Sequence, residues 1–210
     1  MSLVALLTLA GVMLMGAMSP GPDFALVVRN SLMAGRTSGV FCALGIGVGV
    51  LVWAVAAAVG VAGLLAASAT LFAIVKLCGA AYLIYLGVRA LLSAASKKSG
   101  EPERETGTAP GRRSAFVQGL VTNLFNPKTA VFFVALLPQF LPAEATVLSV
   151  VELCLVTATV TVSWFTILAV SVGTLRTALV RPRVRRVIDA VTGTFLVGLG
   201  VRIAAPAAAS

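Results

Sequence analysis

The chain has 210 residues, of which 59% are hydrophobic and 11% are charged, and its formal net charge is +9. A soluble globular domain carries about 25% charged residues, so this composition excludes an ordinary soluble domain and indicates a polytopic membrane protein. The positive charge does not indicate a nucleic-acid partner, because the basic residues lie in short connections between apolar runs, which is the pattern that orients membrane proteins.

The apolar runs predict six membrane-spanning helices, because a spanning helix needs roughly 20 apolar residues. The first run, residues 3–28, is interrupted by Ser19-Pro20-Gly21-Pro22-Asp23. Pro20 and Pro22 lack an N–H group and their rings clash with the preceding turn, so the helix is expected to break there. The later runs cover residues 38–62, 66–92, 115–141, 146–172 and 187–206.

The fourth run contains a second break of the same kind, at Asn126-Pro127-Lys128. A broken backbone persists in hydrocarbon only where protein or a water-filled cavity satisfies its freed polar groups. Both breaks are therefore expected to face an interior site. Paired breaks in corresponding places of two halves of a membrane protein indicate the binding site of a transporter.

Basic residues predict the membrane topology. The first, third and fifth connections between the runs carry Lys or Arg, whereas the connections near residues 64 and 144 carry none. Cytoplasmic connections are enriched in basic residues, so the odd-numbered connections are expected in the cytoplasm and both termini outside it.

The chain divides into two halves that look related. Residues 93–114 are rich in Ser, Gly, Pro and charges of both signs, a composition typical of a flexible linker. The sequence Leu-Gly-Val-Arg occurs at 86–89 in the third run and again at 199–202 in the sixth. Because the first and fourth runs cross in opposite directions, the repeat would be inverted. The predicted fold is an all-α, multi-pass membrane domain in which residues 1–92 and 115–210 form two inverted three-helix repeats.

Four ionisable residues lie within or at the edge of the predicted helices: Asp23, Lys76, Lys128 and Asp189. A charge at the bilayer centre costs about 2.5–3.5 kcal/mol on insertion scales, and a partner or a function usually offsets this cost. Lys76 and Lys128 lie deep in their runs, and the depth of Lys128 favours a functional role over contact with the membrane surface. Asp189 closely follows two arginines and is expected to form a surface ion pair.

The polar residues beside the two breaks each have two interpretations. Asp23 follows Pro22 and is expected to cap the second half-helix, to bind a substrate ammonium group or a proton, or to do both. The N-terminus of a half-helix also suits an anion, so the segment from Ser19 to Asp23 is a candidate for substrate binding. Asn123 and Asn126 offer amide groups that suit a zwitterionic ligand, or that satisfy the broken backbone without a ligand.

These motifs resemble the LysE/RhtB family of amino-acid exporters over nearly the whole chain. The matching pieces occur in the order and spacing of that family: Ser19-Pro20-Gly21-Pro22, Arg36, Gly39, Lys76, Gly79, Tyr82-Leu83, Leu86-Gly87, Phe116, Gly119, Asn123, Asn126-Pro127-Lys128, Phe132-Phe133 and Pro138-Gln139-Phe140.

The resemblance implies a secondary active transporter, not an enzyme, that exports amino acids or close derivatives across the bacterial inner membrane and is driven by protons. Members of the family export basic amino acids, threonine or homoserine, cysteine or leucine, and nothing in the chain selects among them. It implies no cofactor and no metal site. Exposed Gly and Ala faces would permit a homodimer without requiring one. The matched positions that it marks as site candidates are Pro20, Gly21, Pro22, Asn126, Pro127 and Lys128.

Two alternatives remain open: an exporter of a metal ion or another small solute, and a transmembrane electron carrier on a related inverted-repeat fold. The chain contains no His, and acidic residues within its runs are few, which disfavours metal transport. Cys42, Cys78 and Cys154 lie far apart and form no CxxC motif, which disfavours an electron carrier.

Overall fold

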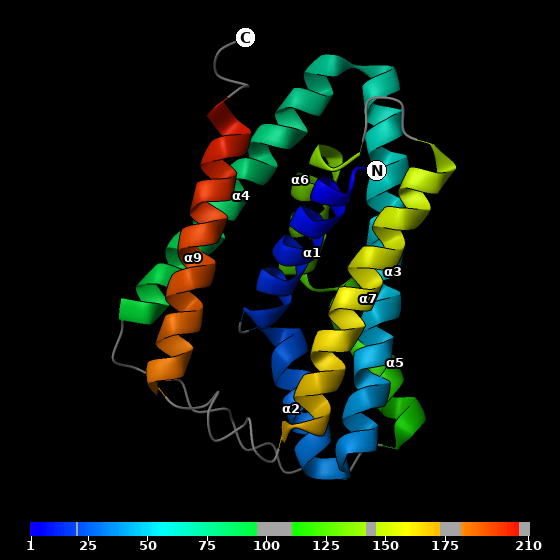
Figure 1. The fold of residues 1–210 in the computed structure, drawn as a ribbon, viewed down its shortest axis with the longest axis vertical. Coiled ribbons are helices and arrows are strands. Elements are labelled where there is room, and N and C mark those ends of the chain that lie inside the picture. Colours follow the sequence, from blue (N-terminus) through cyan, green and yellow to red (C-terminus); the bar gives the residue numbers. More distant parts are fainter. Residues whose placement is uncertain (20, 96–110, 142–145, 173–181, 206–210) are drawn as a thin grey trace.

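The computed structural model describes residues 1–19, 21–95, 111–141, 146–172 and 182–205, and these residues form helices with no strand (Figure 1). Most of the predicted linker, residues 96–110, lies outside this description, as does Pro20. The elements are α1 Leu3–Met18, α2 Pro22–Ala34, α3 Arg36–Ala67, α4 Ala69–Ala95, α5 Arg112–Leu124, α6 Pro127–Leu136, the short 3-10 helix η1 Leu137–Gln139, α7 Val147–Val170 and α9 Pro182–Ala204.

Each predicted break separates two helices, and Pro22 and Pro127 occupy the first positions of α2 and α6. A proline at a helix start loses no hydrogen bond and has the dihedral angle that a helix requires. Several boundaries differ from the prediction, and α2 continues to Ala34 rather than ending at residue 28. The connection expected near residue 64 falls at Ser68, because the Ala- and Leu-rich stretch before it favours helix. Helix α9 begins at Pro182 rather than at residue 187, because arginines also favour helix.

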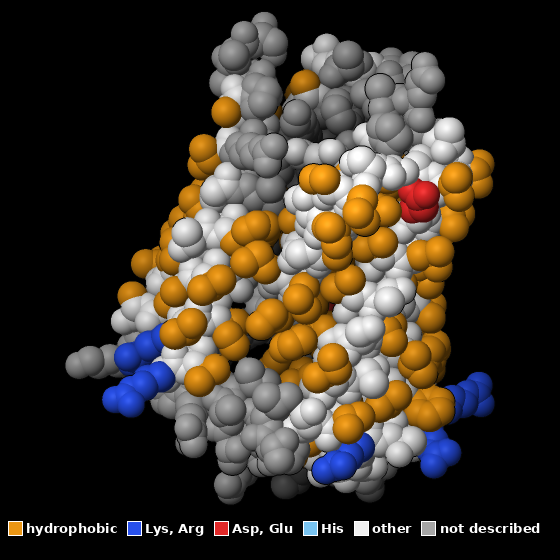
Figure 2. Space-filling model, viewed as in Figure 1, with side chains coloured by type: hydrophobic (Ala, Val, Ile, Leu, Met, Phe, Trp, Pro, Cys, Tyr) orange, Lys and Arg blue, Asp and Glu red, His pale blue; other side chains and the backbone are white. Residues whose placement is uncertain are grey.

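Length and composition identify the chain as a membrane protein. Two described segments are long and apolar enough to cross a bilayer, Arg36–Gly60 of α3 and Val147–Val170 of α7, and the pair α1–α2, bent by 64°, would add a third. Large apolar side chains such as Val4, Val59 and Leu155 are exposed, and Figure 2 shows many such side chains over one face of the molecule. The membrane-protein class is thus confirmed, while six spans in an inverted repeat remain a prediction.

The helices form two groups. Helix α3 packs against α5 and α7, and α2 packs against α3. Helices α4 and α9 pack against each other and lie to one side, where α4 also contacts α6 and α9 contacts α1 (Figure 1). The start of α1 and the end of α9 lie toward one end of the molecule, which we call the termini end (Figure 1). Basic side chains gather at the opposite, basic end (Figure 2). Exposed arginines lie in the first two turns of α3, α5 and α9, at Arg36, Arg112, Arg113, Arg183 and Arg186, and Arg29 is exposed within α2.

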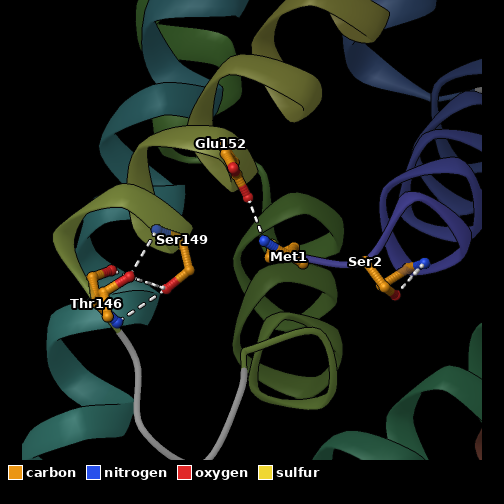
Figure 3. Close-up of polar contacts among 6 residues, drawn as sticks. Met1, Ser2, Thr146, Ser149 and Glu152 are labelled. Carbon is orange, nitrogen blue, oxygen red and sulfur yellow. Dashed lines mark hydrogen bonds and ion pairs between the residues drawn. The ribbon is translucent and has the colours of Figure 1, made fainter.

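Polar contacts fix the termini end of α1 and α7 (Figure 3). The N-terminal ammonium group of Met1 lies 2.6 Å from Oε2 of Glu152 on α7. Helix α7 begins with a capping box in which Thr146 and Ser149 each bind the other's backbone N–H group. These contacts hold the start of α1 against α7, so α1 leads from this end of the molecule to its interior.

The core consists of two apolar clusters. The termini-side cluster includes Met13 of α1, Phe132 and Phe133 of α6, and Leu153 of α7. The basic-side cluster includes the following buried residues of α2, α3, α5 and α7: Val27, Cys42, Ala43, Ile46, Ala115, Phe165, Leu168 and Ala169. The two helix breaks therefore lie between two apolar clusters.

Glycines allow α4 and α9 to approach closely. A Cβ atom added to Gly193 would lie 2.7 Å from the carbonyl oxygen of Gly87 and 2.8 Å from Cγ of Leu91. A Cβ atom added to Gly200 would lie 2.8 Å from the carbonyl oxygen of Ala80. Backbone therefore meets backbone along this pair, as is common where small residues line a membrane-helix interface.

The substitution Gly193→Ala should destabilise the protein, because its methyl group would overlap backbone that cannot move independently. We expect a loss of about 1–3 kcal/mol, the usual cost of overpacking, measured by unfolding in mixed detergent micelles. Gly198→Ala on the same helix is the matched control, because a Cβ atom there meets nothing within 4 Å. Equal stability of the two variants would contradict this account of the α4–α9 contact.

Candidate functional site

The two helix breaks meet at one cavity of about 60 Å³. A single water needs roughly 10–15 Å³ of such space, so the cavity has room for about four to six water molecules. Both α1–α2 and α5–α6 contribute lining residues, and α3 and α7 complete the wall. The lining residues are Met13, Gly16, Ala17, Ser19, Gly21, Asp23, Phe24, Val50, Asn123, Asn126, Lys128, Thr129, Phe132, Phe133, Thr161 and Phe165.

Lys128 of α6 satisfies the broken end of α1. Its Nζ donates to the carbonyl oxygens of Gly16 at 3.3 Å and Ser19 at 3.2 Å. The last carbonyl groups of a helix have no partner within the helix, and a cation is favourable at this negative end of the helix dipole. Lys128 is thus held inside the protein, so membrane-surface contact does not explain this residue.

Asp23 of α2 is 8% exposed, and amide groups from the second break hold one of its two oxygens. Its Oδ2 accepts hydrogen bonds from Nδ2 of Asn123 at 2.9 Å and from Nδ2 of Asn126 at 3.2 Å. The N-cap residue of α2 is Gly21, which makes no side-chain capping bond. The helix-cap interpretation of Asp23 is therefore wrong, because its carboxylate is turned toward α5 and α6 instead of its own backbone.

The asparagines connect the carboxylate to the second break. Asn126 is the N-cap of α6, and its Oδ1 accepts a hydrogen bond from the backbone N–H of Lys128 at 3.0 Å. The carbonyl oxygen of Asn123 accepts one from Nε1 of Trp53 at 3.4 Å. The asparagines thus bind both the broken backbone of α5–α6 and one of the two oxygens of Asp23.

A second carboxylate is buried on α9. Asp189 is 6% exposed, so it does not lie at the surface as predicted. The helix begins earlier than expected, which places Asp189 about two turns inside it, and it shares a buried face with Thr192 and Leu196.

The other predicted site residues divide into three groups. Ser19 and Gly21 line the cavity, and a Cβ atom added to Gly21 would lie 3.7 Å from Nζ of Lys128. Pro22 and Pro127 start their helices and are exposed. Pro20 and the side chain of Lys76 lie outside the described residues, although Lys76 itself is placed in α4.

Thr161 of α7 belongs to the site but was not predicted. It lines the cavity and is 3% exposed. Its Oγ1 has no hydrogen-bond partner, and neither does Oδ1 of Asp23. A signal was present in the sequence, since Thr157 and Thr161 are four residues apart and therefore share one face of a helix.

Comparisons with known proteins identify the family of the chain. The model of the LysE type translocator family matches residues 14–206. The uncharacterized membrane protein YrhP of Bacillus subtilis (strain 168) is 30% identical over 96% of this chain and 97% of its own length. The threonine efflux protein of Escherichia coli (strain K12) is 29% identical over 96% of this chain and 98% of its own length. The threonine efflux protein of Salmonella typhi is also 29% identical. No solved structure gives a significant match.

Replacing Lys128 should destabilise the protein, because two carbonyl groups of α1 would lose their donor and Asp23 would lose a nearby positive charge. For Lys128→Met we expect a loss of about 2–4 kcal/mol, the range for breaking charged contacts in an interior, measured by unfolding in mixed micelles. Lys128→Arg, which keeps the charge and donors, should lose less. Wild-type stability of the methionine variant would show that Lys128 does not support the break.

Proposed function

The chain belongs to the LysE translocator family, and we propose that it exports a small amino acid across the bacterial inner membrane in exchange for protons. The observation that carries this proposal is the pairing of opposite charges, Asp23 and Lys128, around one buried cavity at two helix breaks. An amino acid is a zwitterion, and its two charged groups match these two side chains.

Each charged side chain retains a hydrogen-bond acceptor or donor that a ligand could use. Oδ1 of Asp23 has no partner, so it is available to accept a hydrogen bond from a substrate ammonium group. Lys128 has three N–H donors, of which two are used on α1, so one remains for a substrate carboxylate. The half-helix N-termini of α2 and α6 add positive potential near that carboxylate.

Proton coupling would follow because Asp23 binds either a proton or a substrate ammonium group, but not both at once. A protonated carboxyl group has no charge with which to hold an ammonium group, so a proton and a substrate would bind in alternation. Protons that enter on Asp23 from the outer side would be released on the inner side, where the substrate ammonium replaces them. The proton gradient would then drive the substrate outward.

Transport requires the cavity to open to each side in turn. The two apolar clusters separate the breaks from both ends of the molecule, and we infer that the halves 1–92 and 115–210 rock around the cavity to open one cluster at a time. The repeated Leu-Gly-Val-Arg sequences supply Gly87 and Gly200, which both lie at the α4–α9 contact. The arginines at one end (Figure 2) favour a cytoplasmic basic end and an extracytoplasmic termini end.

The cysteines offer no support for the alternative of an electron carrier. Cys42 lies in the basic-side cluster and Cys154 in the termini-side cluster, and both are free thiols. Cys78 is exposed on α4 and is also free. Electron transfer through a dithiol needs two apposed cysteines, so amino-acid export is the function that the site supports best.

Uptake by inside-out vesicles tests this function directly. With an imposed proton gradient and a panel of labelled amino acids, we expect saturable accumulation of one chemical class, abolished by an uncoupler. Threonine is the first substrate to test, because relatives are named threonine efflux protein. Accumulation of no amino acid by correctly folded protein would contradict the proposal.

Variants of the two charged residues test the site. Asp23→Asn and Lys128→Ala should each abolish accumulation, because each removes one of the charges that bind the zwitterion, while the protein still inserts into the membrane. Glu152→Gln is the control, since it removes a carboxylate that does not line the cavity. Normal flux in both site variants would refute the assignment of Asp23 and Lys128.

A further inference from the structure

We propose that Thr161 of α7 and Asp23 of α2 together form the subsite that binds the primary ammonium group of the substrate. This inference rests on the proposed function, because it divides the cavity into an ammonium end and a carboxylate end. It adds a residue that binds substrate and determines its orientation.

The hydroxyl group of Thr161 is unusual for its helix. One turn earlier, Oγ1 of Thr157 donates to the carbonyl oxygens of Leu153 at 2.9 Å and Cys154 at 3.0 Å. Thr161 has the same i−4 carbonyl available in principle, yet its Oγ1 has no partner. A buried hydroxyl group without a partner costs free energy. A ligand that donates to it would remove this cost.

One carboxylate oxygen of Asp23 has hydrogen-bond partners and the other has none. Two amide groups occupy Oδ2, from Asn123 and Asn126, whereas Oδ1 has no partner. Asp23 and Thr161 come from different helices and line one cavity. The described lining residues therefore present three unpartnered oxygen acceptors on buried side chains, Oδ1 of Asp23, Oγ1 of Thr161 and Oδ1 of Asn123, and among these only the Asp23 oxygen is charged.

A primary ammonium group suits these acceptors better than other ligand groups. It is positively charged and has several N–H donors, whereas a substrate carboxylate would be repelled by Asp23. The only cation among the lining residues, Lys128, lies at the break of α5–α6 and would bind the carboxylate. The apolar lining residues Val50, Phe132 and Phe133 leave an uncharged environment for the substrate side chain.

Three variants separate binding from folding. The probe is L-threonine, and the purified full-length protein is assayed for ligand affinity and for its melting temperature without ligand. Thr161→Val should weaken binding roughly 10- to 100-fold, the effect of losing a hydrogen bond to a charged group. Thr161→Ser keeps the hydroxyl group and should restore affinity to within about threefold of wild type.

Thr157→Val is the matched control. It removes a hydroxyl group that is satisfied by its own helix, so its affinity should stay within about threefold of wild type. The unliganded melting temperature should not fall in Thr161→Val, since this change removes an unpartnered buried hydroxyl, and a rise of roughly 2–4 °C is expected. Weakened binding with undiminished stability is a combination that a merely structural role would not produce.

Analogues identify the group that Thr161 binds. Wild type should prefer L-threonine to the analogue in which a hydroxyl group replaces the ammonium group, and this preference should shrink in Thr161→Val. Equal weakening for both ligands would overturn the subsite, and so would wild-type affinity in Thr161→Val. If wild type binds no amino acid at all, the proposed function fails, and the subsite fails with it.

Discussion

The interior of this protein depends on two broken helices that satisfy each other. The carbonyl groups at the end of α1 are bound by Lys128 of α6, and the carboxylate of Asp23 on α2 is bound by the amides of Asn123 and Asn126. Neither break would be stable alone between the two apolar clusters, because buried backbone groups and charges without partners cost several kcal/mol each. Together they place a positive and a negative side chain beside one cavity.

This mutual satisfaction also links substrate binding to movement. The groups that hold the breaks together are the groups that a zwitterion would bind, so a substrate competes with or completes existing hydrogen bonds. A ligand shifts a conformational equilibrium only by its differential affinity for the two states. Substrate bound between α2 and α6 would therefore change the balance of forces between the two halves of the chain.

The site could be predicted from the sequence because it contains prolines and charged residues within apolar runs, where both are energetically costly. Asp23, Asn126 and Lys128 were identified in this way, and the structure brings them to one cavity. Their partners could not be predicted, because the hydrogen bonds from Lys128 to α1 join residues that are distant in the sequence. Thr161 was missed because a threonine in an apolar helix usually binds its own backbone, as Thr157 does. Asp189 was misplaced because the start of the last helix was taken from the apolar run alone.

The most direct test of the central claim is a double-mutant cycle for Asp23→Asn and Lys128→Met, with the free energy of unfolding measured in mixed micelles. If the two breaks stabilise each other through these charges, the double variant should lose less than the sum of the single losses. The expected difference is about 1–2 kcal/mol, within the range for residues that share one network. A loss in the double variant that equals the sum of the two single losses to within about 0.5 kcal/mol, as expected for independent sites, would contradict the account.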